Sequence, residues 1–188
     1  VSLVYFNQRF RDLIQYVPGG PPNYLGSFAN LTEAESNGYE AEFEFTPPGI
    51  VSASGNYTQA SPLVKRVSSS YTGDLLPGQP LLRRPTHSGS GTLRVTPRRG
   101  SFAVTATYIG KRPDLDFNEF PSPTVTLPAY TKIDVAGSVD IWRAASNRSS
   151  FSLTARAENV LNKEYETVLH FPAPGRVLII GARFSGSL

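Results

Sequence analysis

The chain has 188 residues, enough for one sizeable folded domain, and its formal net charge is +3. Its Lys and Arg residues are spread over many short segments without a basic stripe, so the charge does not indicate nucleic-acid binding. No run of about eighteen apolar residues occurs, which excludes a membrane-spanning helix. The absence of Cys excludes disulfides and thiolate metal sites. The 16 Gly and 16 Pro beside 9 Tyr and 11 Phe are typical of strands joined by turns, so we expect an all-β fold.

Alternation of polar and apolar residues predicts about eight strands. They lie near residues 1–14, 28–46, 50–62, 82–97, 101–112, 128–142, 150–162 and 175–184. Most of these segments reach the roughly nine to eleven residues that a tilted strand needs to cross a bilayer, whereas a strand of a soluble domain usually has about five or six. The strand lengths therefore favour a membrane-spanning barrel.

The clearest alternation lies in the second segment, where Glu40, Glu42 and Glu44 interleave with aromatic and small residues. In a barrel the aromatic side faces lipid and the carboxylates face a wet interior. Other charged residues on polar strand faces share this predicted interior position: Arg94, Lys132, Asp134, Arg156 and Glu158. Water or basic groups on neighbouring strands would screen the three glutamates, and the candidate basic partners are Arg94, Lys132 and Arg156. A soluble sheet, with the glutamates outside and the aromatic residues in a core, is the alternative.

The connections alternate in length along the chain. Those at 46–49, 96–100 and 143–149 are short, and those near 15–27, 63–81, 113–127 and 163–174 are long. In an antiparallel up-and-down meander, every second connection lies on the same rim, so all long connections meet at one end. This arrangement is typical of an outer-membrane barrel with short periplasmic turns and long extracellular loops, and it predicts that both chain ends are periplasmic.

Polar and aromatic residues in the long connections are candidates for ligand contact. They are Arg112, Asp114, Asp116, Asn118, Tyr165 and His170. The spacing of Asp114, Asp116 and Asn118 is like the start of a calcium loop, but Glu119 and Val125 stand where such a loop needs Gly and a bidentate Glu. We therefore expect a solvated loop and no metal. No catalytic or cofactor-binding motif is present, so we expect neither enzyme activity nor a cofactor.

Basic residues near the ends of the strands lie on the rim of the long connections. They are Lys65, Arg66, Arg83, Arg84, Lys111 and Arg112. Guanidinium and ammonium groups bind phosphate oxygens well, so these residues are candidates for contact with lipopolysaccharide phosphates. Ordinary solvation of the rim is the alternative.

Three motifs in the last third of the chain carry a family resemblance. Tyr130 and Asp134 stand in LPAYTKIDVAGSVDI, Asn159 and Tyr165 stand in AENVLNKEYE, and PAPGRVLIIGARF closes the series. Their order closely resembles the C-terminal strands of TonB-dependent outer-membrane receptors of the siderophore and cobalamin type. FANLTEAESNGYEAEFEF and LLRRPTHSGSGTLRV resemble earlier strands of that family, so the resemblance covers nearly the whole chain.

The resemblance implies that residues 1–188 are a single partial barrel domain, about the last eight strands of a barrel of about 22. It implies import of iron chelates, cobalamin or a similar scarce nutrient across the bacterial outer membrane, with energy from the TonB complex. The implied partners are outer-membrane lipid and lipopolysaccharide, the remaining strands and the plug domain, and the TonB complex through that plug. The plug and the TonB-contacting segment are expected to be absent from these residues.

Two features limit what the resemblance implies. Family members usually end on an aromatic residue that the barrel-assembly machinery reads, whereas here Leu188 follows Phe184 by a few residues. Leu188 or Phe184 would have to substitute for that residue, so the resemblance does not imply efficient insertion. Two other functions are also compatible with the sequence: a small stand-alone outer-membrane barrel with a structural or adhesive role, and a soluble carbohydrate-binding β-sandwich.

Overall fold

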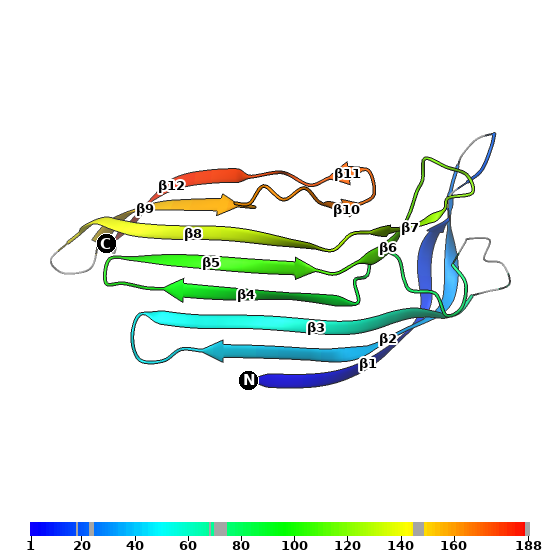
Figure 1. Ribbon diagram of the computed structural model, residues 1–188, viewed down its shortest axis with the longest axis horizontal. Coiled ribbons are helices and arrows are strands. Elements are labelled where there is room, and N and C mark those ends of the chain that lie inside the picture. Colours follow the sequence, from blue (N-terminus) through cyan, green and yellow to red (C-terminus); the bar gives the residue numbers. More distant parts are fainter. Residues whose placement is uncertain (18, 23–24, 68, 70–74, 145–148, 187–188) are drawn as a thin grey trace.

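Eight long strands form one antiparallel sheet in the order β1-β2-β3-β4-β5-β8-β9-β12 (Figure 1). The computed structural model describes residues 1–188 except 18, 23–24, 68, 70–74, 145–148 and 187–188. The strands are β1 (Ser2–Val17), β2 (Ser27–Phe45), β3 (Val51–Arg66), β4 (His87–Val95), β5 (Gly100–Ile109), β8 (Tyr130–Arg143), β9 (Ser149–Glu158) and β12 (Val177–Gly186). Each pairs with the next long strand along the chain, which confirms the predicted all-β meander.

The structure differs from the strand prediction in two details. The segments near 113–127 and 163–174 contain two small hairpins, which pair β6 (Arg112–Leu115) with β7 (Thr124–Leu127) and β10 (Glu166–Val168) with β11 (Phe171–Pro172). The predicted strand near 82–97 begins only at His87, since the residues before it belong to the long connection. Much of the predicted short connection 143–149 lies outside the described residues, as does Leu188.

The sheet has one continuous apolar face, which follows from its register. One row of paired residues crosses seven strands: Phe45, Ala53, Leu93, Val104, Val135, Ala157 and Leu178. A second row is Val51, Val95, Phe102, Gly137, Ala155 and Ile180. Because side chains alternate along each strand, the opposite face carries the polar residues. In the described residues β1 and β12 each pair on one side only, so the sheet is not closed.

Aromatic residues on the apolar face gather near its two ends. Tyr5, Tyr39, Tyr57 and Tyr108 lie toward the long connections, and Phe102, Trp142, Phe151 and Phe184 lie toward the short turns. Tyr5 and Tyr39 are in contact, with ring centroids 5.2 Å apart. Two aromatic belts that flank an apolar band are typical of strands that cross a membrane.

The long connections all lie at one end of the sheet and the short turns at the other, as the alternation of their lengths predicts (Figure 1). The buried apolar residues of the described part of the chain also lie at the end with the long connections: Val17, Ala34, Val64, Leu75, Leu115 and Leu127. The described residues include no helix with the length and apolarity needed to cross a bilayer. The packed part of the structure is thus the end where the ligand candidates lie.

Candidate functional site at the rim of the long connections

Asp114 joins three long connections that are far apart in sequence. Its side chain is fully buried, and its Oδ1 accepts a hydrogen bond from Arg83 Nε at 2.8 Å. Its Oδ2 accepts a second bond from the backbone N–H of Leu169 at 2.9 Å. A buried carboxylate needs such partners, because leaving it unpaired costs several kcal/mol (about 3–5 for a broken buried pair). Asp114 therefore holds the connections together, and both of its oxygens are occupied.

Arg112 forms the second tie between the connections. It is almost completely buried and donates a hydrogen bond to the backbone carbonyl of Glu166. Its guanidinium lies 5.5 Å from the ring centroid of Tyr130, and that ring stacks on Tyr165 with centroids 4.1 Å apart. A cation over an aromatic ring is stabilising, more so when it is shielded from water. Arg112, Tyr130 and Tyr165 therefore pack the base of the rim.

Asp116 and His170 form an exposed contact above this packed base. His170 Nε2 lies 3.0 Å from Asp116 Oδ1, which also accepts a hydrogen bond from the backbone N–H of Asn118 at 3.0 Å. Among the described residues, no cluster of three or more His, Cys, Asp or Glu side chains is placed to hold a metal ion. Asp114, Asp116 and Asn118 thus make separate contacts and do not converge on one point. Because Asp114 is buried, the prediction of a solvated loop was wrong at this residue.

The Asp116 contact predicts a response to acid. The backbone N–H of Asn118 and, to a smaller extent, His170 hold the Asp116 pKa below its ordinary value of 3.8. A lowered pKa in the folded state means that the ionised form stabilises the loop above the ordinary value and that this contribution is lost as the pH falls through the lowered pKa. We expect hydrogen–deuterium exchange in residues 113–122, corrected for intrinsic rates, to rise as the pH falls below about 4. Glu164→Gln, an exposed control, should keep this rise, and Asp116→Asn should weaken it; an unchanged rise in Asp116→Asn would contradict the assignment.

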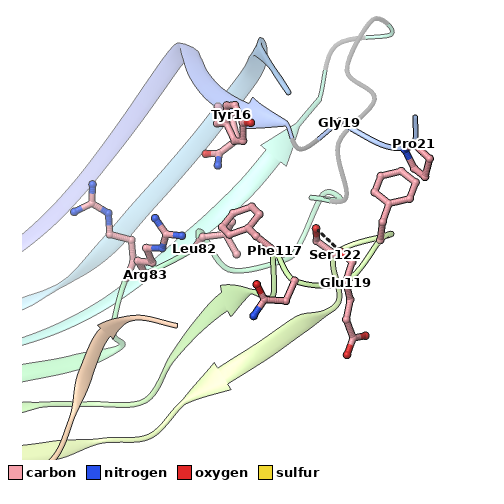
Figure 2. Close-up of a pocket in the computed structure, with 12 residues that line it drawn as sticks. Tyr16, Gly19, Pro21, Leu82, Arg83, Phe117, Glu119 and Ser122 are labelled. Atoms are coloured by element: carbon pink, nitrogen blue, oxygen red, sulfur yellow. Dashed lines mark hydrogen bonds between the residues drawn. The ribbon is translucent and has the colours of Figure 1, made fainter. Parts of the chain in front are cut away.

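A hollow of about 960 Å³ opens beside the Arg83–Asp114 ion pair (Figure 2). Its aromatic lining residues are Tyr16, Phe117 and Phe120, and Arg83 and Arg84 contribute positive charge. The Arg83 guanidinium lies 5.8 Å from the centroid of the Phe117 ring, so the charge and the ring are close together. Asn118 also lines the hollow. Sequence reasoning named Asn118 but missed the aromatic residues, because nothing in the local sequence shows that residues near 16 and near 117 share one hollow.

The structure places the predicted ligand-contact residues in one region but at different depths. Arg112 and Asp114 are buried, and Tyr165 is half-buried under Tyr130, so these three residues hold the rim in shape. Asn118 and His170 are exposed, and Asp116 lies between them. Ligand contact stays a prediction for all six, and the exposed side chains are the ones that a ligand can reach in this arrangement.

The predicted interior residues do share one face of the sheet. Successive partners across five strands are Glu42, Asn56, Ser90, Thr107 and Lys132. A second row of successive partners on this face is Arg94, Ala103, Ala136 and Arg156. Glu40, Glu44, Asp134 and Glu158 lie at even spacing from these residues along their own strands. The face is therefore polar across the sheet.

Two of the three candidate partners of these glutamates, Lys132 and Arg156, were wrong. Lys132 pairs with Asp134 at 2.8 Å and Arg156 pairs with Glu158 at 3.0 Å, each within its own strand. In the register, Lys132 and Arg156 lie on β8 and β9, several strands away from β2. Glu40 and Glu42 face Val4 and Ser2 of β1 instead. The ion pairs of β2 form at Glu33 and Glu35, which sequence reasoning did not single out.

The three C-terminal motifs contact one another at the end of β9. The Asp134 carboxylate accepts a hydrogen bond from the Asn159 backbone N–H at 2.8 Å. Asn159 is buried and pairs with both backbone groups of Lys163, at 2.8 and 2.9 Å. Asn162 Oδ1 accepts a hydrogen bond from the Arg176 backbone N–H at 2.9 Å, which reaches the last motif. The motif residues therefore shape the connection between β9 and β12.

A family model described as "TonB dependent receptor-like, beta-barrel" matches residues 1–160. The chain belongs to this family. The vitamin B12 transporter BtuB of Vibrio cholerae serotype O1 is 36% identical over 109 residues, which cover 57% of this chain and 17% of that protein. The chain therefore spans about a sixth of the length of this relative.

Solved structures show the same fold at low sequence identity. The siderophore receptor PiuA from Acinetobacter baumannii has a TM-score of 0.69 at 16% identity, covering 97% of this chain and 26% of that one. The ferripyoverdine receptor of the outer membrane of Pseudomonas aeruginosa has a TM-score of 0.66 at 18% identity, covering 96% and 24%. The chain thus matches about a quarter of each of these two receptors.

Membership of the TonB-dependent receptor family places the chain in the bacterial outer membrane. Members of this family are transporters and receptors. The two other functions considered from the sequence are not supported. The long strands form a single sheet, whereas a sandwich needs two packed sheets, and the sheet is not closed into a small barrel within the described residues.

Proposed function

We propose that residues 1–188 form one continuous part of the wall of a TonB-dependent receptor that imports an iron chelate, cobalamin or a similar scarce nutrient. The observation that carries this proposal is the two-faced sheet. One face is apolar from strand to strand, the other is polar, and the long connections gather at one end. In an outer-membrane barrel the apolar face meets lipid, and the long connections form the extracellular mouth.

The polar face would then line the interior of the barrel. Glu40, Glu42 and Glu44 are exposed on this face, and the pairs Lys132–Asp134 and Arg156–Glu158 lie farther along it. Charged groups of both signs keep such a surface hydrated, which suits a wall beside a water-filled or plugged interior. The aromatic and cationic hollow at the mouth suits a ligand with aromatic and anionic groups.

The proposal includes partners beyond residues 1–188. They are the remaining barrel strands, a plug domain and, through the plug, the TonB complex, with outer-membrane lipid and lipopolysaccharide around the barrel. The wall itself has a transport role and no enzymatic one, and it needs no cofactor. Support for these partners comes from membership of the family and from the sheet edges of β1 and β12, which each offer one unpaired side.

The test is nutrient uptake by cells in which the full-length receptor is the sole route. We expect labelled vitamin B12 or a labelled iron–siderophore complex to accumulate, and Phe117→Ala/Phe120→Ala to lower uptake at limiting concentration about tenfold. Leu76→Ala removes an exposed apolar side chain from the same rim outside the hollow, so it should leave uptake unchanged. A receptor that inserts as a barrel but takes up neither nutrient class would contradict import of an iron chelate or cobalamin.

A further inference from the structure

A compact group of charges lies on the apolar face of the sheet, beyond its aromatic belt. We call Arg9, Glu33, Glu35, Lys65 and Arg66 the charged patch. Arg9 pairs with Glu35 in the register, and four residues farther along the same two strands Tyr5 pairs with Tyr39. No irregularity interrupts these pairs, so Arg9 and Glu35 point to the same side as the tyrosines. That side is the one that faces lipid in the proposed barrel.

A bulge in β3 adds two cations to the patch. Leu63 pairs with Glu35 and Val64 with Ala34, but the next pair joins Arg66 with Glu33, so Lys65 is an extra residue. Neighbouring residues of a regular strand point to opposite faces. The bulge interrupts this alternation, because the extra residue changes the face to which the neighbouring side chains point. Lys65 and Arg66 therefore both reach carboxylates on the outward face, although they are consecutive in sequence.

The ion pairs cover the carboxylates and leave the cations exposed. Arg9 lies 3.3 Å from Glu33 and 3.8 Å from Glu35, Lys65 lies 3.3 Å from Glu35, and Arg66 lies 3.2 Å from Glu33. The side chains of Glu33 and Glu35 are only 14% and 13% exposed. Those of Arg9, Lys65 and Arg66 are 58%, 43% and 70% exposed. The outer surface of the patch is thus cationic, and its net charge is positive.

The height of the patch matches the headgroup layer. Four residues along a strand correspond to about 13 Å, or about 10 Å along the barrel axis at the usual tilt. The Arg9–Glu35 pair therefore lies about 10 Å outside the Tyr5–Tyr39 pair, which marks the edge of the hydrocarbon layer, and the Glu33–Arg66 pair, six residues beyond Tyr39, lies about 15 Å outside it. On the lipid-facing side of a barrel, the groups at this level belong to lipid headgroups. In the outer leaflet these groups include phosphates, which Arg and Lys bind well.

We propose that the charged patch binds the phosphate groups of the phosphorylated glycolipid of the outer leaflet. This inference rests on the proposed function, because it needs the barrel orientation with the long connections outside. It also divides the basic rim residues into two groups. Lys65 and Arg66 face the lipid. Arg83 instead pairs with Asp114, and Arg112 donates a hydrogen bond to the Glu166 carbonyl.

The test uses the full-length receptor in lipid nanodiscs, with bisphosphorylated lipid A as the probe and its dephosphorylated form as the reference. We expect Lys65→Gln/Arg66→Gln to weaken binding of bisphosphorylated lipid A about ten- to thirtyfold, since each cation near a membrane surface contributes roughly 1 kcal/mol. Arg98→Gln/Arg99→Gln is the matched control, because it removes two consecutive exposed cations at a short turn. It should leave binding unchanged. Glu33→Gln/Glu35→Gln should bind as tightly as the unaltered receptor or more tightly.

Three results would overturn the inference. They are equal affinity of Lys65→Gln/Arg66→Gln and the unaltered receptor, an equal loss in the Arg98→Gln/Arg99→Gln control, and full competition by inorganic phosphate, which would indicate a site for the free ion. Gel mobility before and after heating checks insertion of every variant. A receptor that fails to insert as a barrel would overturn the proposed function as well, whereas a well-inserted barrel without the difference in lipid A binding would overturn this inference alone.

Discussion

Replacement of Val104 by Arg is expected to destabilise the inserted receptor by about 2–4 kcal/mol, the cost of an Arg on the lipid face near the middle of a bilayer. Val104 lies between Leu93 and Val135 in the apolar row that crosses seven strands. A guanidinium at this position has no polar neighbour within the row, so it must lose its hydration or distort the bilayer. The free energy of unfolding in lipid vesicles, measured by denaturant titration, checks this value.

The control for Val104→Arg is the next residue along the same strand. Thr105 points to the polar face, where it pairs with Asp134 in the register and its hydroxyl is 2.9 Å from that of Thr92. Thr105→Arg loses this hydroxyl contact but places a cation opposite a carboxylate, so we expect a change within about 1 kcal/mol. Equal destabilisation by the two variants would show that the apolar face does not meet lipid.

Most of the sheet could be predicted from the sequence, because the strand signal is local. In β2 the alternation of Glu40, Glu42 and Glu44 with aromatic residues needs only the period of an extended chain. The order of the strands also follows from a local property, since a connection as short as 46–49 can only join antiparallel neighbours. The family motifs added the expectation of a larger barrel.

The rim could not be predicted in the same way, because its contacts are distant in sequence. Asp114 is bonded to Arg83, which is 31 residues away, and to Leu169, which is 55 residues away. No periodic pattern links such residues, so the sequence predicts only loops in these segments. The bulge at Lys65 is a second example. A regular strand would have separated Lys65 from Arg66, and only the observed register shows that both contact glutamates of β2.

Asn159→Ala is the second variant with a large expected effect, about 2–4 kcal/mol of lost stability in the full-length receptor. The Asn159 side chain is almost fully buried, at 2% exposure. It accepts a hydrogen bond from the Lys163 N–H and donates to the carbonyls of Lys163 and Pro174, the latter at 3.5 Å. Its φ is 49°, in the left-handed region that Asn tolerates and Ala disfavours by roughly 1–2 kcal/mol. Loss of the amide thus leaves backbone groups unpaired and adds strain.

Two further variants separate these contributions. Asn159→Gly removes the amide but accepts the left-handed backbone, so it should be more stable than Asn159→Ala by about 1 kcal/mol. Asn162→Ala is the matched control, because Asn162 has a similar φ of 51° but is exposed, and its side chain accepts a bond from the Arg176 N–H. We expect it to cost about 1–2 kcal/mol, nearly all of it backbone strain, because water replaces the lost hydrogen bond of this exposed side chain. Denaturant titration together with hydrogen–deuterium exchange over residues 159–176 measures both effects. If Asn159→Ala and Asn162→Ala lower the free energy of unfolding equally, the buried amide does not anchor the connection between β9 and β12. The contacts among the three motifs would then not be what stabilises this connection.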